Sequence, residues 1–448
     1  RPPRSTPKPS SAASDVYKRQ RILGAMLILF GFSLAIPIIT SFIYQDQGIH
    51  IFITSFIIFS VIGFFLYYPN RLCENDIRTK EGFLIVVLFW VVLSIFGSIP
   101  FMLDKQLSLS FADALFESVS GWTTTGATIL SNIDILSPSI LIYRQMLQWL
   151  GGMGIVILAL AILPMLGVGG MQMYKAETTG PIKDTKISPR ITETARNLWK
   201  VYLGLTVFCA ISYYLAGMSI FDAISHSFST IAIGGFSTHS QSIGFFDNFA
   251  IEIICMIFMI LSAMNFILHF LSLQTKSIKV YFQDTELRTY MKLIIFFILV
   301  IILYGIFNDD GFTNSRHVFF QTISFITTSG FTSTSYNLWP SFILSTLIAA
   351  SFIGACAGST GGGIKVVRIL LLFKLVKREL LTIIHPSAEI PIKLNEKLIT
   401  EDISATAWNF FILYIISFFV LSMILLATGV DSTTAFSAVA SCINNLGT

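Results

Sequence analysis

Four short polar turns contain the residues of this sequence that are best suited to binding an ion. Each turn has a glycine with a serine six residues before it, in the pairs Ser120 and Gly126, Ser229 and Gly235, Ser324 and Gly330, and Ser441 and Gly447. No carboxylate stands between serine and glycine, so the available oxygens are backbone carbonyls and hydroxyls. Glycine can turn the neighbouring carbonyls towards a common axis without steric cost. The turns therefore predict a ring of carbonyl oxygens, the ligands that replace the water shell of potassium in known pores.

The predicted ion path consists of each glycine and the two residues before it. Its members are Thr124, Thr125, Gly126, Ile233, Gly234, Gly235, Thr328, Ser329, Gly330, Asn445, Leu446 and Gly447. Their side chains range from threonine to leucine, which favours coordination by the backbone rather than by side chains. The nearby Asp113, Glu117 and Asp222 are interpreted as structural hydrogen-bond acceptors or surface charges, not as ligands.

A second informative stretch is GACAGSTGGGIKVVRI, residues 354–369, which lies inside an apolar run. Each glycine weakens a helix by up to about 1 kcal/mol relative to alanine, and a broken helix at membrane depth usually lines a cavity. We expect a flexible loop below the turns that blocks or opens the ion path, formed by Gly361, Gly362 and Gly363, with Lys365 near the path. The alternative is that Lys365 and Arg368 simply end a span at the cytoplasmic surface.

The composition shows what must position these turns. Hydrophobic residues make up 54% of the chain and charged residues 12%, and the mean hydropathy is +0.75. Because an ordinary globular domain is about one quarter charged, we predict an all-α polytopic membrane protein embedded in a lipid bilayer. Apolar runs long enough to span lie at 22–43, 50–69, 82–101, 138–168, 198–217, 245–273, 290–307, 338–373 and 404–428.

Lysine and arginine are concentrated in alternate loops. Among the intervening loops, 102–137 contains only Lys105, 218–244 contains neither residue, and 308–337 contains only Arg316. By the positive-inside rule, the four turns lie outside the cell and the N-terminus lies in the cytoplasm.

Short apolar segments precede the four turns, at 111–121, 221–231, 315–326 and 431–442. They are too short to span a bilayer, so we interpret them as re-entrant helices that line a cavity, rather than as ordinary external connectors. The predicted organisation is a disordered, non-native tail (1–20), two N-terminal spans (21–70), and four repeats of span, re-entrant pore helix, filter turn and span. The repeats occupy 82–174, 198–275, 288–380 and 402–448.

The motifs SGWTTTGAT, GGFST, TTSGFT and NNLG, with GACAGSTGGGIKVVRI, resemble the membrane subunit of the Trk/Ktr/HKT superfamily of potassium transporters. The two extra N-terminal spans resemble its bacterial Trk-type branch. The resemblance implies an inner-membrane homodimer with one pore per protomer, cytoplasmic nucleotide-binding regulatory subunits, and an intramembrane gate at Gly361–Lys365. It also implies selectivity for potassium over sodium, because Gly126 makes glycine common to all four filters. The family continues past NNLG with a final span, so we expect the last span of the fourth repeat to be missing here.

Three other functions were weighed against a channel. A cation-coupled potassium or sodium symporter would favour inverted repeats and ionisable residues at the midplane, and a non-conducting truncated fragment is the second alternative. An enzyme would need a nucleophile, paired carboxylates or a metal cluster. The five cysteines and six histidines are dispersed, so we expect no enzyme activity, no resident metal other than potassium, and no nucleic-acid partner.

Overall fold

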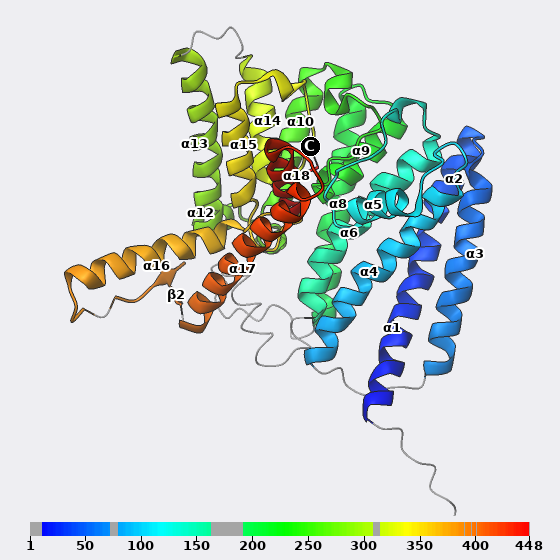
Figure 1. The fold of residues 1–448 in the computed structure, drawn as a ribbon, viewed down its shortest axis with the longest axis horizontal. Coiled ribbons are helices and arrows are strands. Elements are labelled where there is room, and N and C mark those ends of the chain that lie inside the picture. The colour runs from blue at the N-terminus through cyan, green and yellow to red at the C-terminus, as the bar shows by residue number, and fades with distance from the viewer. Residues whose placement is uncertain are drawn as a thin grey trace, which may run out of the picture.

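The computed structural model describes residues 11–71, 79–162, 191–307, 314–388, 390–395, 397–399 and 401–447. They form a nearly all-helical bundle (Figure 1). The long helices are α1 (Ser11–Ser33), α3 (Gly48–Tyr67), α4 (Thr79–Leu103), α6 (Pro138–Ile162), α8 (Ile191–Leu215), α13 (Thr285–Phe307), α16 (Val366–Ile384) and α17 (Glu401–Leu426). The shorter helices are α2 (Ala35–Tyr44), α5 (Phe111–Trp122), α9 (Ile220–Ala232), α10 (Phe249–Ala263), α11 (Phe266–Thr275), α12 (Lys279–Gln283), α14 (Ser315–Thr327), α15 (Ser341–Ile353) and α18 (Ser432–Asn444). The strands β1 (Lys393–Leu394) and β2 (Lys397–Leu398) form one antiparallel hairpin.

Two apolar spans precede the rest of the bundle, as the sequence predicts. They run over Arg19–Tyr44 and Gly48–Asn70. The prediction that 1–20 is disordered is wrong for residues 11–20, because α1 begins at Ser11. Once a span has nucleated a helix, each added residue gains a hydrogen bond at little further cost. Residues 1–10 lie outside the described residues.

The predicted span 245–273 is not one continuous helix, because α10 and α11 meet at a bend of 93°. The first helix ends at Ala263, and Asn265 begins the second, because its Oδ1 accepts a hydrogen bond from the N–H of Ile267 at 2.9 Å. Near the break, the carbonyl of Ala263 and the N–H of Phe266 both bond, each at 3.0 Å, to the glycine-rich stretch, at Cys356 and Gly358. A break inside the bundle is tolerated because other backbone satisfies the freed polar groups.

The four segments before the polar turns are short helices, and all four lie in the upper half of Figure 1. Each packs against the long helix before it: α5 on α4, α9 on α8, α14 on α13, and α18 on α17. Their first residues are fixed by N-cap side chains, which accept hydrogen bonds from otherwise unpaired backbone N–H groups. These caps are Ser110, Ser219, Asn314 and Asp431.

The apolar run 338–373 is interrupted, as its glycines predict. Helix α15 ends at Ile353, and α16 begins only at Val366 and projects away from the bundle (Figure 1). The alternative in which an unbroken helix reaches the interface near Lys365 is therefore wrong. The basic stretch 163–190 and the acidic residues Asp309 and Asp310 lie outside the described residues.

Candidate functional site

All four polar turns leave their helices in the same way. The residue two positions before each glycine has left-handed backbone, with φ of 58° at Thr124, 55° at Ile233, 63° at Thr328 and 54° at Asn445. Three of the glycines also have positive φ, namely 82°, 78° and 81° at Gly126, Gly235 and Gly330. Residues with a Cβ rarely adopt a positive φ, so the backbone is strained at the residue two positions before each glycine. The glycine itself adopts a positive φ without steric cost.

The serine six residues before each glycine supports the turn. Its backbone carbonyl accepts the N–H of the residue just before the glycine, at 2.8–2.9 Å in all four turns. In the first and third turns the hydroxyls of Ser120 and Ser324 also donate to the carbonyls of Ala127 and Phe331, at 2.5 Å and 2.7 Å. The repeated spacing of serine and glycine therefore has a structural cause, because the serine carbonyl holds the residue before the glycine in every turn.

The four turns meet in a closed ring. A Cβ added to Gly126 would lie 2.0 Å from the carbonyl oxygen of Gly234, and one added to Gly235 would lie 2.2 Å from that of Ser329. A Cβ on Gly330 would lie 3.0 Å from the nitrogen of Gly447, and one on Gly447 would lie 2.3 Å from the oxygen of Thr125. Each turn thus touches the next, and the structure brings all twelve predicted residues together although they are spread over residues 124–447.

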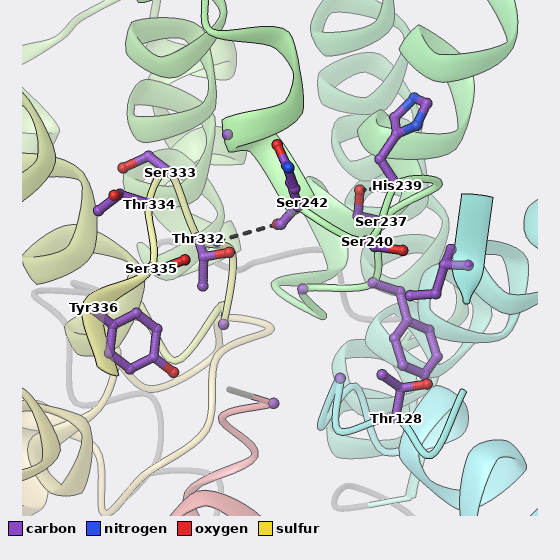
Figure 2. Close-up of a pocket in the computed structure, with 18 of the residues that line it drawn as sticks. Thr128, Ser237, His239, Ser240, Ser242, Thr332, Ser333, Thr334, Ser335 and Tyr336 are labelled. Carbon is purple, nitrogen blue, oxygen red and sulfur yellow. Dashed lines mark hydrogen bonds between the residues drawn. The ribbon is translucent and has the colours of Figure 1, made fainter. Parts of the chain in front are cut away.

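A polar cavity of about 560 Å³ opens above the ring and is lined by all four glycines. The side chains labelled in Figure 2 come from the loops after α5, α9 and α14, and Arg144 of α6 also lines the cavity. Hydroxyl groups predominate, and the N–H of Thr332 donates to the hydroxyl of Ser242 at 3.2 Å across the cavity wall (Figure 2). Among the described residues that line the cavity, none is acidic.

Behind the first two turns lies a buried ion pair that sequence reasoning missed. Arg144 Nε lies 2.8 Å from Glu117 Oε1, and both side chains are 0% exposed. Glu117 also accepts hydrogen bonds from Thr128, while Arg144 donates to the carbonyl of Ser237 at 3.3 Å. Glu117 is thus the structural acceptor that was expected, but its partner was not. The available signal was a charge inside an apolar span, because such charges are rare and usually paired.

Gln148, one helical turn beyond Arg144, supports the second turn. Its Nε2 donates to the carbonyl of Gly234 at 2.6 Å, and its Oε1 accepts from the hydroxyl of Ser229 at 2.5 Å and from the N–H of Phe236 at 3.2 Å. In this turn, a side chain from α6 therefore takes the place of the direct bond from serine to carbonyl. Nothing in the local sequence identifies this role, because it depends on which face of α6 meets the turn.

The glycine-rich stretch 354–365 lies directly beneath the ring. The N–H of Gly362 donates to the hydroxyl of Thr328 at 2.7 Å, and the hydroxyl of Thr360 donates to the carbonyl of Ile231 at 3.0 Å. A Cβ on Gly362 would lie 1.9 Å from the carbonyl oxygen of Asn444. Of the predicted gate residues, Gly362 therefore contacts the carboxyl ends of α14 and α18, while the neighbouring Thr360 contacts that of α9. Lys365 folds back to donate to the carbonyl of Gly361.

His239 lies on the cavity wall between two aspartates. Its Nδ1 is 3.2 Å from Asp134 Oδ1, its Nε2 is 3.3 Å from Asp222 Oδ1, and its ring stacks on that of Phe245. Burial disfavours a charged imidazole, but the interactions with Asp222 and Asp134 outweigh burial and raise the pKa of His239 above 6.5. The protonated ring therefore ties the first outer loop to the second.

We expect the heat stability of the protein to depend on this histidine. A folded-state pKa raised above the unfolded value gives stability that is fully present below about pH 6.5 and is lost as pH rises through the folded-state pKa. The unfolding temperature in detergent should therefore fall as the pH is raised above about 6.5, and His239→Gln should flatten that fall. His385→Gln, at an exposed histidine after α16, is the control. Equal slopes in the unsubstituted protein and His239→Gln would contradict this assignment.

The chain is similar to known proteins in both sequence and structure. The model of the TrkH family, described as a cation transport protein, matches residues 48–448. The chain is 49% identical over 431 residues to the Trk system potassium uptake protein TrkH of Salmonella typhimurium, covering 95% of this chain and 89% of that protein. It is 39% identical to the Trk system potassium uptake protein TrkG of Escherichia coli K12, covering 95% of this chain and 88% of that protein. The crystal structure of the potassium transporter TrkH from Vibrio parahaemolyticus superimposes with a TM-score of 0.89 at 43% identity, covering 97% of this chain and 90% of that one.

Proposed function

Because this chain belongs to the TrkH family of cation transport proteins, we propose that it carries potassium into the cell through the ring of four turns. The observation that carries the proposal is the ring itself: four turns, each containing glycine, contact one another in sequence beneath a polar cavity. The curated relatives named above are potassium uptake proteins, which supports potassium as the transported ion. The protein is a multi-pass membrane protein, and we place it in the inner membrane with its N-terminus in the cytoplasm.

In this proposal the backbone does the coordinating. Carbonyls of the predicted filter residues replace water around a dehydrated potassium ion, and the hydroxyl-lined cavity above accepts the hydrated ion. The pore helices end at the ring, so their carboxyl ends add partial negative charge beside the path. Gln148 and the pair of Glu117 and Arg144 hold the first two turns from behind, without contributing a side chain to the ion.

The proposed gate is the glycine-rich stretch 354–365, which we call the glycine loop. It lies under the ring and bonds to the third pore helix through Gly362 and Thr328, so an ion that leaves the filter towards the cytoplasm meets this loop. The positive charge of Lys365 at its end opposes a cation there. Movement of the loop away from Thr328 opens the path.

The proposal includes two protein partners, and both are implied by the resemblance to the family. The protein forms a homodimer with one pore in each protomer, and a cytoplasmic nucleotide-binding subunit regulates the gate. The basic stretches 175–200 and 374–397 are candidates for contact with that subunit. Their described residues include Arg196 and Lys200 on α8 and Lys374, Lys377 and Arg378 on α16.

The decisive test is rubidium uptake into liposomes that contain the purified protein, with and without competing sodium. We expect uptake that sodium inhibits weakly. Gly126→Ser should relax this preference, because the new Cβ would lie 2.0 Å from the carbonyl oxygen of Gly234 and must displace the second turn. Gly204→Ser is the matched control, since a Cβ there meets nothing within 4 Å. If the preference for rubidium over sodium is the same in Gly126→Ser and Gly204→Ser, the ring has a structural role only and is not the ion path.

A further inference from the structure

A buried glutamate side chain holds both ends of the glycine loop. Glu286 is the second residue of α13 and is only 3% exposed. Its Oε1 accepts hydrogen bonds from the N–H of Ala357 at 2.7 Å and from the N–H of Val367 at 3.1 Å. Ala357 lies near the start of the loop and Val367 at the start of α16, so a single oxygen atom joins the two ends.

The base of the loop has more attachments than its tip. At the tip, Gly362 donates to the hydroxyl of Thr328, and Thr360 donates to the carbonyl of Ile231. At the base, the two backbone N–H groups that donate to Glu286 are joined by further backbone bonds, from Cys356 to the carbonyl of Ala263 and from Lys365 to the carbonyl of Ile353, both at 3.0 Å. A buried donor that loses its acceptor destabilises the conformation that buries it. The base is therefore the fixed point, and the tip beneath the ring is the part that can move.

The helix start that carries Glu286 is itself attached to the hairpin of β1 and β2. Asn395, in the hairpin turn, accepts the N–H of Thr285 at 2.9 Å through Oδ1 and donates to Asp284 Oδ2 at 3.3 Å through Nδ2. The other oxygen of Asp284 accepts the N–H of Leu287 at 2.7 Å. One asparagine side chain thus occupies the first turn of α13, immediately beside Glu286.

An apolar contact runs parallel to this polar one. Leu394 of the hairpin is 2% exposed and packs in one buried cluster with Ala357 and Val367, the two residues whose N–H groups Glu286 accepts. Leu371 of α16 and Ala407 of α17 complete the cluster. A displacement of the hairpin therefore acts on both ends of the glycine loop.

We propose that Glu286 is the positioning residue that sets where the glycine loop lies beneath the ring, and that the hairpin Lys393–Leu398 is mechanically coupled to the loop through Asn395 and the start of α13. This inference rests on the proposed function in one respect, namely that the loop is the gate. The anchoring itself is a statement about structure and can be tested without ion transport.

The first measurement is hydrogen–deuterium exchange of the full chain in detergent, followed by mass spectrometry. Glu286→Leu should speed exchange in peptides covering residues 355–367 by roughly tenfold or more, because two buried backbone N–H groups lose their shared acceptor. Glu286→Gln keeps an oxygen acceptor, and its exchange rate should lie between those of Glu286→Leu and the unsubstituted protein. Asn395→Ala should have a smaller effect on the same peptides. Glu379→Leu removes an exposed carboxylate that pairs with the adjacent Arg378, and it should leave exchange in these peptides unchanged.

The second measurement is rubidium uptake by the same variants. Glu286→Leu should raise uptake in the absence of any regulatory subunit, by on the order of tenfold, and Glu286→Gln should restore most of the resting value. If Glu286→Leu does not fold, Glu286→Gln and Asn395→Ala carry both measurements. If exchange in the loop is unchanged in the folded variants, Glu286 does not anchor the loop. If exchange is faster but rubidium uptake is unchanged, Glu286 anchors the loop but the loop is not the gate. If even the unsubstituted protein takes up no rubidium, the proposed transport function is wrong, and the exchange rates still decide whether Glu286 anchors the loop.

Discussion

Arg144→Met is expected to destabilise the folded protein by about 3–5 kcal/mol, because removing one partner leaves the other as an uncompensated buried charge. Both side chains of the pair with Glu117 are 0% exposed. Methionine fills a similar volume but cannot donate to Glu117 or to the carbonyl of Ser237. The measurement is the free energy of unfolding in mixed micelles, from a denaturant titration followed by tryptophan fluorescence.

Two further variants separate the causes. Glu117→Leu combined with Arg144→Met should recover part of the loss, because no charge then stays buried without a partner. Arg378→Met breaks a pair whose carboxylate is 64% exposed, and it should change stability by less than about 1 kcal/mol. A loss of similar size in Arg144→Met and Arg378→Met would show that the buried pair does not carry the stability assigned to it.

Gly235→Ala is expected to reduce rubidium uptake by at least roughly tenfold, since each loss of about 1.4 kcal/mol in ligand interaction is a factor of ten. Two effects combine at this position. The φ of 78° is costly for a residue with a Cβ, and that Cβ would lie 2.2 Å from the carbonyl oxygen of Ser329, which belongs to the predicted ion path. The third turn must move, and the potassium ligands move with it.

Gly429→Ala provides the matched control for this prediction. Its φ of 91° is as unfavourable, but a Cβ there meets nothing within 4 Å. Backbone strain alone should therefore cost stability in both variants, while the drop in uptake should be confined to Gly235→Ala. Equal uptake by the two variants, measured at equal amounts of folded protein in the liposomes, would remove the third turn from the ion path.

The sequence predicted the features that recur along the chain. The repeated spacing of serine and glycine places all four turns correctly, because a local turn geometry requires both residues. The glycines after Gly354 likewise indicate a break, since a helix cannot easily contain them. Both signals are local in the sequence: the spacing of serine and glycine recurs four times, and the glycines after Gly354 are clustered. They can therefore be recognised without knowing which distant segments pack against these residues.

The features that sequence reasoning missed depend on contacts between distant segments. The break between α10 and α11 follows a single polar residue, Asn265, and is stable only because Cys356 and Gly358 bond to the freed backbone. Gln148 supports a turn 86 residues away from it. Glu286 lies at the start of an apolar helix, where a carboxylate looks like an ordinary solvated end. No periodicity or composition identifies these partners, since each depends on the tertiary arrangement.

The closed ring has a consequence for how selectivity can change. All four of its turns belong to one chain and differ in side chains, so a substitution changes the residue in one turn and disturbs that turn and the neighbour it touches, whereas in a homotetrameric pore the same substitution changes every turn at once. Ion preference in a single-chain ring can therefore shift in graded steps. Each turn is also free to acquire its own support, as the second has done with Gln148, without imposing that support on the other three.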